Sequence, residues 1–213
     1  TPFYAYGSGK INDRLSIGIG VNTPFGSSAQ WPEGWAGRYL VEDISLMAIF
    51  VQPTISYKIT DRIGIGAGFV YAFGNVKFNR ALPYNNASVN LEGSANDIGF
   101  NVGVFFKPTD KLSLGIDYRS EIVMAVEDGN ATFTVPSSLQ GSIPAENTFS
   151  AELPMPANLD FGLAFKFNEK LTLAASVNWV MWETYDSLKF TFEEQSDLLS
   201  SSSPRLYSDS WIS

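Results

Sequence analysis

Neither cysteine nor histidine occurs among the 213 residues of the chain. Their absence excludes disulfides, thiolate and imidazole metal sites, cysteine nucleophiles and every catalytic triad that uses histidine. Long apolar runs are also missing: the longest, residues 46–51, is far shorter than the roughly 20 residues of a membrane-spanning helix. We therefore predict that the protein is not an enzyme, has no cofactor or metal site, binds no nucleic acid and is not a helical membrane protein.

The residues that are present suit a β structure with many turns. Hydrophobic residues make up 45% of the chain and aromatic residues 14%, which argues against disorder. The 18 glycines and 11 prolines are typical of a turn-rich chain.

One short pattern recurs four times. Each copy has a cation, an Asn or Thr near an acidic residue, a second cation and then an apolar residue, which is typical of a tight hairpin turn. Between the copies there is room for two strands and one long connection, so short turns are predicted to alternate with long loops at about 22–43, 75–96, 127–157 and 183–206. The four copies are KINDRLS at 10–16, KITDRIG at 58–64, KPTDKLS at 107–113 and KFNEKLT at 166–172.

Bulky apolar residues alternate with small or polar residues over long stretches beside these turns. Such runs indicate strands longer than the roughly 5 or 6 residues typical of soluble sandwiches. Glycine is frequent on the opposite face, where it suits a crowded lumen better than a water-exposed strand. The bulky face is predicted to include Ile17, Phe69, Val102, Phe161 and, in one run, Leu112, Leu114, Ile116, Tyr118, Ile122, Met124 and Val126.

These features predict an all-β fold: a transmembrane up-and-down antiparallel β-barrel of about eight to nine strands, with its bulky face on lipid. Short turns on one rim and long loops on the other are typical of the bacterial outer membrane. A soluble secreted β-sandwich, which would need no detergent, is the alternative.

Charge follows the same division between turns and loops. Eight of the 14 basic residues lie in the four turn segments, whereas the loops are acidic by comparison. Solvation explains this division, and the alternative is that divalent cations bridge the acidic loops to lipopolysaccharide.

Several segments resemble the FadL family, the outer-membrane transporters of long-chain fatty acids and aromatic hydrocarbons. The resemblance implies fourteen strands and an N-terminal plug with an Asn-Pro motif, so residues 1–213 are expected to be a single barrel domain that is incomplete at both ends, with a ninth strand beginning near Tyr207. The segments that carry it are LSIGIGVNTPFG at 15–26, WPEGWAGRY at 31–39, QPTISYKITDRIGIGAGF at 52–69, LGIDYRSEI at 114–122 and LPMPANLDFGLAFKFNEKLTLAASVNWVMWETYDSLKF at 153–190.

Strand parity predicts an apolar upper lumen near the long loops. An apolar cavity suits a hydrocarbon or an amphipathic ligand better than it suits a water-filled porin, although these side chains could simply fill the interior. Charged residues, Asp117, Arg119, Glu121 and Asp160, are also expected to point inward, as a structural network or, through Arg119, as a contact for a carboxylate head group. The apolar residues predicted to point inward and to bind ligand are Leu46, Phe50, Val70, Val123, Val180 and Trp182.

A second candidate site is Asn22, Pro24, Phe25 and Gly26, because proline cannot donate to the ladder and glycine tolerates a kink. The family resemblance implies that a kink in the corresponding strand opens the barrel wall and lets cargo leave sideways. An ordinary strand end is the alternative.

Three loop aromatic residues, Trp31, Trp35 and Tyr39, are predicted to form an external capture surface, with interfacial anchoring as the alternative.

The function predicted from these features is passive uptake of hydrophobic small molecules or fatty acids, in contact with outer-membrane lipid and lipopolysaccharide. The alternative is a structural or partner-binding barrel with a secretion-system protein as its partner, like the FadL-like component of type IX secretion.

Overall fold

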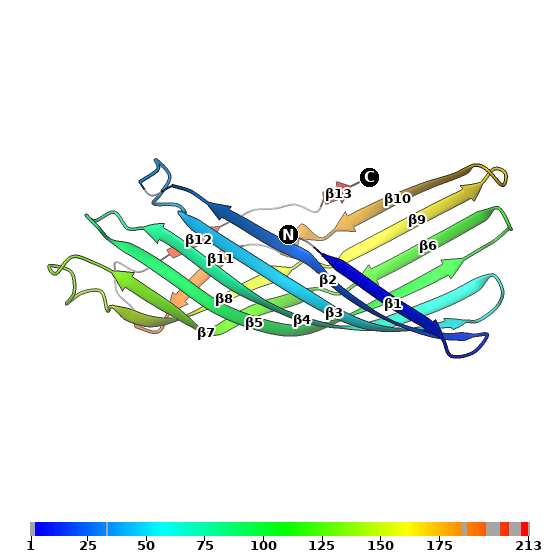
Figure 1. Cartoon of the computed structure of the whole chain (residues 1–213), viewed down its shortest axis with the longest axis horizontal. Helices are drawn as coiled ribbons and strands as arrows, with labels where there is room; N and C mark the ends of the chain where they lie inside the picture. The colour runs from blue at the N-terminus through cyan, green and yellow to red at the C-terminus, as the bar shows by residue number, and fades with distance from the viewer. Residues whose placement is uncertain (1–2, 33, 185–186, 195–200, 205–209, 213) are drawn as a thin grey trace.

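The computed structural model describes residues 3–32, 34–184, 187–194, 201–204 and 210–212, which form one curved antiparallel sheet (Figure 1). Its main path runs β1-β2-β3-β4-β5-β6-β9-β10-β13, and β7, β8, β11 and β12 pair beside this path. No helix among the described residues is long and apolar enough to cross a membrane. The elements are β1 (Tyr4–Lys10), β2 (Leu15–Gln30), β3 (Asp43–Lys58), β4 (Ile63–Ala81), β5 (Ser88–Phe106), β6 (Leu112–Arg119), β7 (Ile122–Thr134), β8 (Glu146–Met155), β9 (Asn158–Lys166), β10 (Thr172–Val180), the 3₁₀ helix η1 (Trp182–Thr184), β11 (Ser187–Phe192), β12 (Ser201–Pro204) and β13 (Ser210–Ile212).

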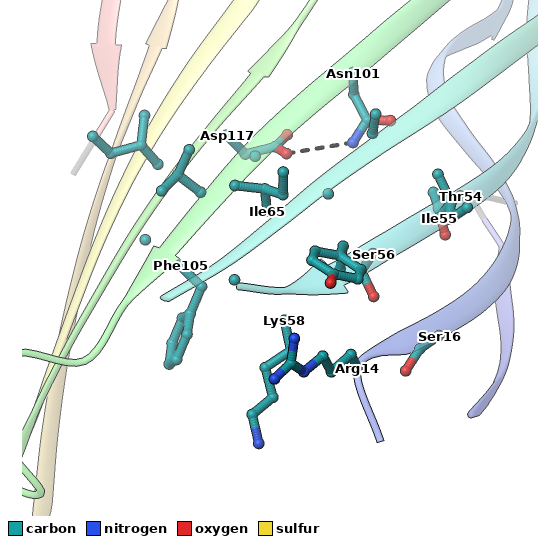
Figure 2. Close-up of a pocket in the computed structure, with 18 of the residues that line it drawn as sticks. Arg14, Ser16, Thr54, Ile55, Ser56, Lys58, Ile65, Asn101, Phe105 and Asp117 are labelled. Atoms are coloured by element: carbon teal, nitrogen blue, oxygen red, sulfur yellow. Dashed lines mark hydrogen bonds between the residues drawn. The ribbon is translucent and has the colours of Figure 1, made fainter. Parts of the chain in front are cut away.

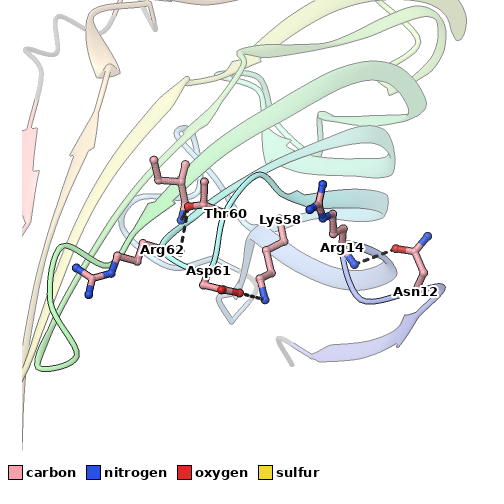
Figure 3. A network of polar contacts seen from close by, with 7 residues as sticks. Asn12, Arg14, Lys58, Thr60, Asp61 and Arg62 are labelled. Atoms are coloured by element: carbon pink, nitrogen blue, oxygen red, sulfur yellow. Dashed lines mark hydrogen bonds and ion pairs between the residues drawn. The ribbon is translucent and has the colours of Figure 1, made fainter.

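The four repeated segments are turns, as predicted, and all four lie at the same end of the strands (Figure 1). In the first, Asn12 Oδ1 accepts a hydrogen bond from the backbone N–H of Arg14 at 2.9 Å (Figure 3). It also accepts one from the backbone N–H of Leu15 at 2.8 Å. Thr60 Oγ1, Thr109 Oγ1 and Asn168 Oδ1 accept the equivalent bonds in the other three turns. The repeated Asn or Thr therefore fixes the turn by replacing a backbone acceptor.

One of these turns carries an ion pair. Lys58 Nζ lies 2.6 Å from Asp61 Oδ1 in the second turn (Figure 3). The hydrogen bond from Lys58 and its positive charge lower the pKa of the Asp61 carboxyl. Both side chains are exposed, so the pair adds little to stability.

The bulky face of the sheet is uncovered, as predicted for a face that contacts lipid. The side chains of Ile17, Phe69, Val102 and Phe161 are 49%, 48%, 45% and 39% exposed. A β-sandwich would have buried this face under a second sheet, so the sandwich alternative is wrong.

The outer ends of the strands extend further than predicted. β4 and β5 have 19 residues each, so the loop predicted over 75–96 is reduced to residues 82–87. At about 3.3 Å per residue such a strand is roughly 60 Å long, and even at a tilt near 45° it exceeds the hydrocarbon thickness of about 30 Å. The hairpin therefore projects beyond the membrane, where polar residues alternate on its outer face.

The run after the third turn is interrupted, and part of its predicted orientation is wrong. β6 ends at Arg119 and β7 begins at Ile122. The neighbouring run formed by β8 and β9 breaks at the same level, between Met155 and Asn158. One extra residue at each break reverses the parity of the residues beyond it. The side chains of Ile122, Met124 and Val126, predicted to face lipid, are buried on the inner face.

The interruption also opens a gap in the hydrogen-bonded wall. β5 pairs with β6 from Asn101 to Phe106 and with β7 from Ser88 to Glu92. Between the pairs Asn101↔Arg119 and Glu92↔Asn130, β5 advances 9 residues (101 − 92) while the β6–β7 run advances 11 (130 − 119). One of the two additional residues lies at the break after Arg119, and the other lies in a bulge of β7 between Val126 and Gly129. Gly93–Gly99 of β5 have no ladder partners on the β7 side, and we call this gap the β5–β7 seam.

The strand number agrees with the prediction once the interrupted strands are joined. Among the described residues, counting β6 with β7 and β8 with β9 gives nine strands from β1 to β13, both included, with β11 and β12 lying at the loop end. The predicted start of the last strand, Tyr207, lies outside the described residues, but β13 pairs with β10 through Trp211 and its neighbours.

Candidate functional site

The inner face of the sheet divides into an apolar zone near the loops and a polar zone near the turns. In the apolar zone, Phe50, Val70 and Ile122 are 1%, 0% and 1% exposed. They belong to one hydrophobic cluster that spans β3, β4, β5, β7 and β8. The upper inner face is therefore apolar, as the parity argument predicted.

An apolar cavity of about 150 Å³ lies within this zone. Its wall includes Leu46, Ala95, Met124 and Val126, which come from β3, β5 and β7. Further lining residues from β4, β8 and β11 include Val76, Ala151, Met155 and Phe190. The cavity is closed on the sheet side by alternating strand residues and offers very few polar groups to an occupant.

The predicted lumen residues are only partly brought together. Leu46 lines the cavity, Phe50 and Val70 are in the same hydrophobic cluster, and Val180 is also buried. Val123 is a correction: it alternates with the buried Ile122 and Met124 and is only partly buried on the other face, because the break after Arg119 reverses the parity. Trp182 lies in the 3₁₀ helix η1 and not in a strand, because β10 ends at Val180.

A transverse row of polar side chains lies below the apolar zone. Asn101 Nδ2 donates to Asp117 Oδ1 at 3.3 Å (Figure 2). Asp117 is in turn the direct register partner of Asp160. Asn178 Nδ2 then donates to Asp160 Oδ1 at 2.6 Å. The row borders an open hollow of about 660 Å³ on the side of the turns. Glu121, predicted to point inward with them, is exposed at the strand break.

Arg119 lies at the boundary between the two zones. Its guanidinium carbon is 5.9 Å from the centroid of the Phe50 ring. With the Asn158 amide oriented to satisfy its neighbours, its oxygen accepts from Arg119 Nη2 at 2.6 Å. Arg119 is thus held beside the aspartate row and against an apolar ring, where a guanidinium suits a carboxylate ligand.

The region around Pro24 is a bulge and not a strand end. The β2–β3 register shifts between Asn22 and Phe25, so that Thr23 and Pro24 together face one residue of β3. Pairing resumes at Phe25 and continues to Gln30. Thr23 also bonds the residue that precedes β1, since its N–H donates to Phe3 O at 3.1 Å.

The β5–β7 seam is held by side chains in place of a ladder. Asp97 Oδ2 accepts a hydrogen bond from the Val123 N–H at 2.9 Å. A Cβ on Gly99 would lie 2.6 Å from Ile122 Cγ1, and one on Gly93 would lie 2.5 Å from Val126 Cγ1. The two glycines therefore let β7 side chains pack directly on the backbone of β5.

The chain matches a known family along nearly its whole length. The family model for "Outer membrane protein transport protein (OMPP1/FadL/TodX)" matches residues 2–213. The chain belongs to this family. It is therefore part of a bacterial outer-membrane β-barrel, as the sequence predicted.

Individual members of the OMPP1/FadL/TodX family are similar over much of the chain. Outer membrane protein P1 of Haemophilus influenzae is 21% identical over 216 residues, covering 86% of this chain and 46% of that protein. The chain thus spans about half the length of this relative. A solved FadL homologue of Pseudomonas aeruginosa has a TM-score of 0.86 and 21% identity, covering 98% of this chain and 54% of that one. The toluene transporter TodX of Pseudomonas putida has a TM-score of 0.74 and 19% identity, covering 98% and 61%.

In this chain, the loop aromatic residues predicted to form a capture surface border a polar pocket. Trp31 stacks on Trp35 with ring centroids 4.5 Å apart, and Trp35 Nε1 donates to Val41 O at 2.8 Å. Tyr39 packs against Arg38, whose guanidinium carbon is 4.4 Å from its ring centroid. Trp31 and Tyr39 are 47% and 43% exposed and line a pocket of about 840 Å³.

Sequence reasoning misses the cavity residues Ala95, Met124, Val126 and Met155. Alternation places Met124 and Val126 on the lipid face, and the stretches that contain Ala95 and Met155 fall in predicted loops. Pro156, in the break between β8 and β9, is a sequence signal for that break, because proline interrupts a ladder. The signal predicts the reversed orientation only when it is combined with the break after Arg119 on the paired strand.

Proposed function

We propose that the protein takes up hydrophobic small molecules, fatty acids or monoaromatic hydrocarbons, passively across the outer membrane. The observation that supports this function is the apolar cavity on the inner face, lined by Leu46, Met124 and Val126. Its volume of about 150 Å³ equals that of an apolar cavity that stays dry and binds benzene. Hydrocarbon gains free energy on leaving water for such a site and requires no energy source.

Arg119 extends the proposal to amphipathic cargo. It lies 5.9 Å from the Phe50 ring, so a fatty acid could place its chain among the apolar side chains and its carboxylate on the guanidinium. The similar toluene transporters handle cargo without a carboxylate, so the apolar cavity is the common requirement in this proposal.

Filling the cavity tests the function. Ala95→Phe places a ring in the cavity, because Ala95 lines it and is 9% exposed. We expect uptake of radiolabelled long-chain fatty acid or toluene to fall at least ten-fold in cells that have this variant as their only copy. Asn96→Phe, on the exposed side of the same strand, is the matched control and should retain uptake. Unchanged uptake in folded Ala95→Phe, or a stable stoichiometric protein partner without ligand uptake, would favour the secretion-system alternative.

We further propose that cargo leaves the lumen sideways through the wall. The sequence predicts this exit near Asn22, Pro24, Phe25 and Gly26, and the bulge there is consistent with it. The β5–β7 seam is the second candidate, because seven residues of β5, from 93 to 99, lack ladder partners directly beside the cavity residues Ala95 and Val126.

A disulfide distinguishes the two exits in a chain that has no native cysteine. An ideal Cβ on Gly93 lies 3.5 Å from Val126 Cβ, within the range of a disulfide. We expect oxidised Gly93→Cys/Val126→Cys to lose at least nine-tenths of uptake and to regain it on reduction. The control pair Ser8→Cys/Gly18→Cys, at 3.6 Å across the intact β1–β2 ladder, should be insensitive to oxidation. Full uptake with the seam locked would place the exit elsewhere, with the Pro24 bulge next to be tested.

A further inference from the structure

The pocket between the β2–β3 and β4–β5 loops has a composition that apolar cargo does not explain. Most of its lining is polar, and it includes Gln30, Asp43, Asn79 and Asn85. Exposed aromatic rings of Trp31 and Tyr39 stand at its wall. Aromatic faces combined with amide and carboxylate groups are suited to a ligand with both apolar C–H faces and many hydroxyls.

The floor of this pocket belongs to the outer face of the barrel. Gln30, Asp43 and Asn79 are consecutive register partners on β2, β3 and β4. By alternation Asp43 shares its face with Met47, and Asn79 shares its face with Phe73, and both Met47 and Phe73 are exposed. The strand residues of the pocket therefore lie on the side that faces the surrounding membrane, while Leu82, Tyr84 and Ala87 of the β4–β5 loop, which also line it, pack with the inner hydrophobic cluster.

Its height places the pocket above the hydrocarbon. The exposed apolar residues of β4 end at Phe73, and the outward residues after it are Asn75, Lys77 and Asn79. Asn79 is six positions beyond Phe73 (79 − 73), which at about 3.3 Å per residue and a tilt near 45° is roughly 14 Å further out. In the outer leaflet this is the level of the polar head groups and sugars.

The loops hold the pocket in a defined shape. Glu42 N–H donates to Asn79 O at 2.7 Å, and Ala81 N–H donates to Arg38 O at 2.9 Å, so the β2–β3 loop is bonded to β4. Trp31 N–H donates to Glu42 O at 2.8 Å. A site built in advance in this way loses less conformational entropy on binding.

Charge and hydrogen-bonding capacity select the ligand. Arg38 is opposed by Glu42 and Asp43, so the lining carries a net charge of −1 and disfavours phosphate. The Oδ1 atom of Asn79 is buried and has no hydrogen-bond partner among the described residues. No group of three or more acidic, His or Cys side chains in the described part of the chain could hold a metal ion.

We propose that this pocket binds a neutral sugar of the lipopolysaccharide core in the outer leaflet. One face of Trp31 is covered by Trp35, and the other stacks on the pyranose ring, while Asp43, Asn79 and Gln30 hydrogen-bond its hydroxyls. The site is separate from the cavity of the proposed function and does not depend on it.

The test measures binding of lipopolysaccharide to the purified full-length protein in detergent by isothermal titration calorimetry. The probes are lipopolysaccharide with a complete core, deep-rough lipopolysaccharide that lacks the outer sugars, and the delipidated core oligosaccharide. We expect the complete-core form to bind at least ten-fold more tightly than the deep-rough form. Asp43→Ala and Trp31→Ala should each abolish this difference, and it should persist in a chelator.

Ser94→Ala, an exposed change on the outer face of β5 outside the pocket, is the matched control and should retain the full difference. Asp43→Asn keeps the shape of the side chain and gives a second variant if Asp43→Ala prevents folding. Folding of each variant is measured by the heat-dependent shift of the protein band on a gel. Equal affinity for the complete and deep-rough forms, or loss of binding in chelator, would overturn the proposal. Equally tight binding of the delipidated oligosaccharide would assign the pocket to a soluble glycan. It would overturn the proposal that the ligand is held in the outer leaflet.

Discussion

At the scale of single residues, glycine on the inner face allows close packing only at certain positions. A Cβ on Gly68 would lie 2.8 Å from Thr54 Cγ2 and 3.1 Å from Pro53 O, and would also contact Asn101 Oδ1. A Cβ on Gly115 would have nothing within 4 Å. Alternation places both glycines on the inner face, but it does not show which of the two positions requires glycine.

Gly68→Val is expected to destabilise the folded protein by about 1–3 kcal/mol, because backbone and side-chain atoms already occupy the space it needs. Gly115→Val should change stability by less than about 0.5 kcal/mol, the usual range of a change that meets no neighbour. Urea unfolding of both variants in lipid vesicles measures the difference. Equal effects would show that the strand position, and not the local contact, determines the cost.

At the scale of elements, the sequence predicted the strands and turns well because each hairpin repeats the same local chemistry. The Asn or Thr of each turn accepts backbone hydrogen bonds within three residues, so the signal is local. The interior of the upper lumen was predicted less well. Ile122, Met124 and Val126 alternate perfectly, but one extra residue after Arg119 reverses their face, and this shows only in the pairing with β5 and in the burial of the side chains.

The same lack of a local signal applies to the seam. Asp97 lies near the boundary of a predicted loop, yet its carboxylate accepts a hydrogen bond from Val123 N–H, 26 positions along the chain. No sequence pattern over a short window contains such a contact.

Asp97→Ala is expected to loosen β7 from β5 by leaving the Val123 N–H unpaired, a change of about 1 kcal/mol for a partly buried hydrogen bond. Hydrogen exchange should accelerate at Val123 and its neighbours in β7. Exchange in β6, which keeps its ladder with β5, should be unchanged. Uniform acceleration across β6 and β7 would mean that Asp97 supports the whole sheet.

At the scale of the whole molecule, the uncovered outer face determines where the protein can exist. Phe69 pairs with Phe100 near the middle of the apolar region, and the two side chains are 48% and 50% exposed. No described residue covers them, so lipid must do so.

Phe69→Lys is expected to cost about 2–4 kcal/mol of folding free energy in vesicles, the penalty for a lysine at the midplane of a barrel's lipid face. Ser56→Lys, which projects into the polar hollow on the inner face, should cost far less. Urea titration of vesicle-folded protein compares the two. Similar costs at both positions would contradict the assignment of the outer face.

The apolar outer stretch of β4, from Ile63 to Phe73, also determines the hydrophobic thickness of the barrel wall. Ten steps (73 − 63) at about 3.3 Å, inclined near 45°, give a hydrophobic height of roughly 23 Å, close to the band of about 25 Å seen in barrels of this kind. Thick bilayers would have to thin around such a protein, at a cost that rises with each ångström of mismatch, whereas the thin outer membrane fits it without distortion. The protein should accordingly fold faster and more completely into short-chain lipid than into long-chain lipid, and this preference would help to keep it in the outer membrane.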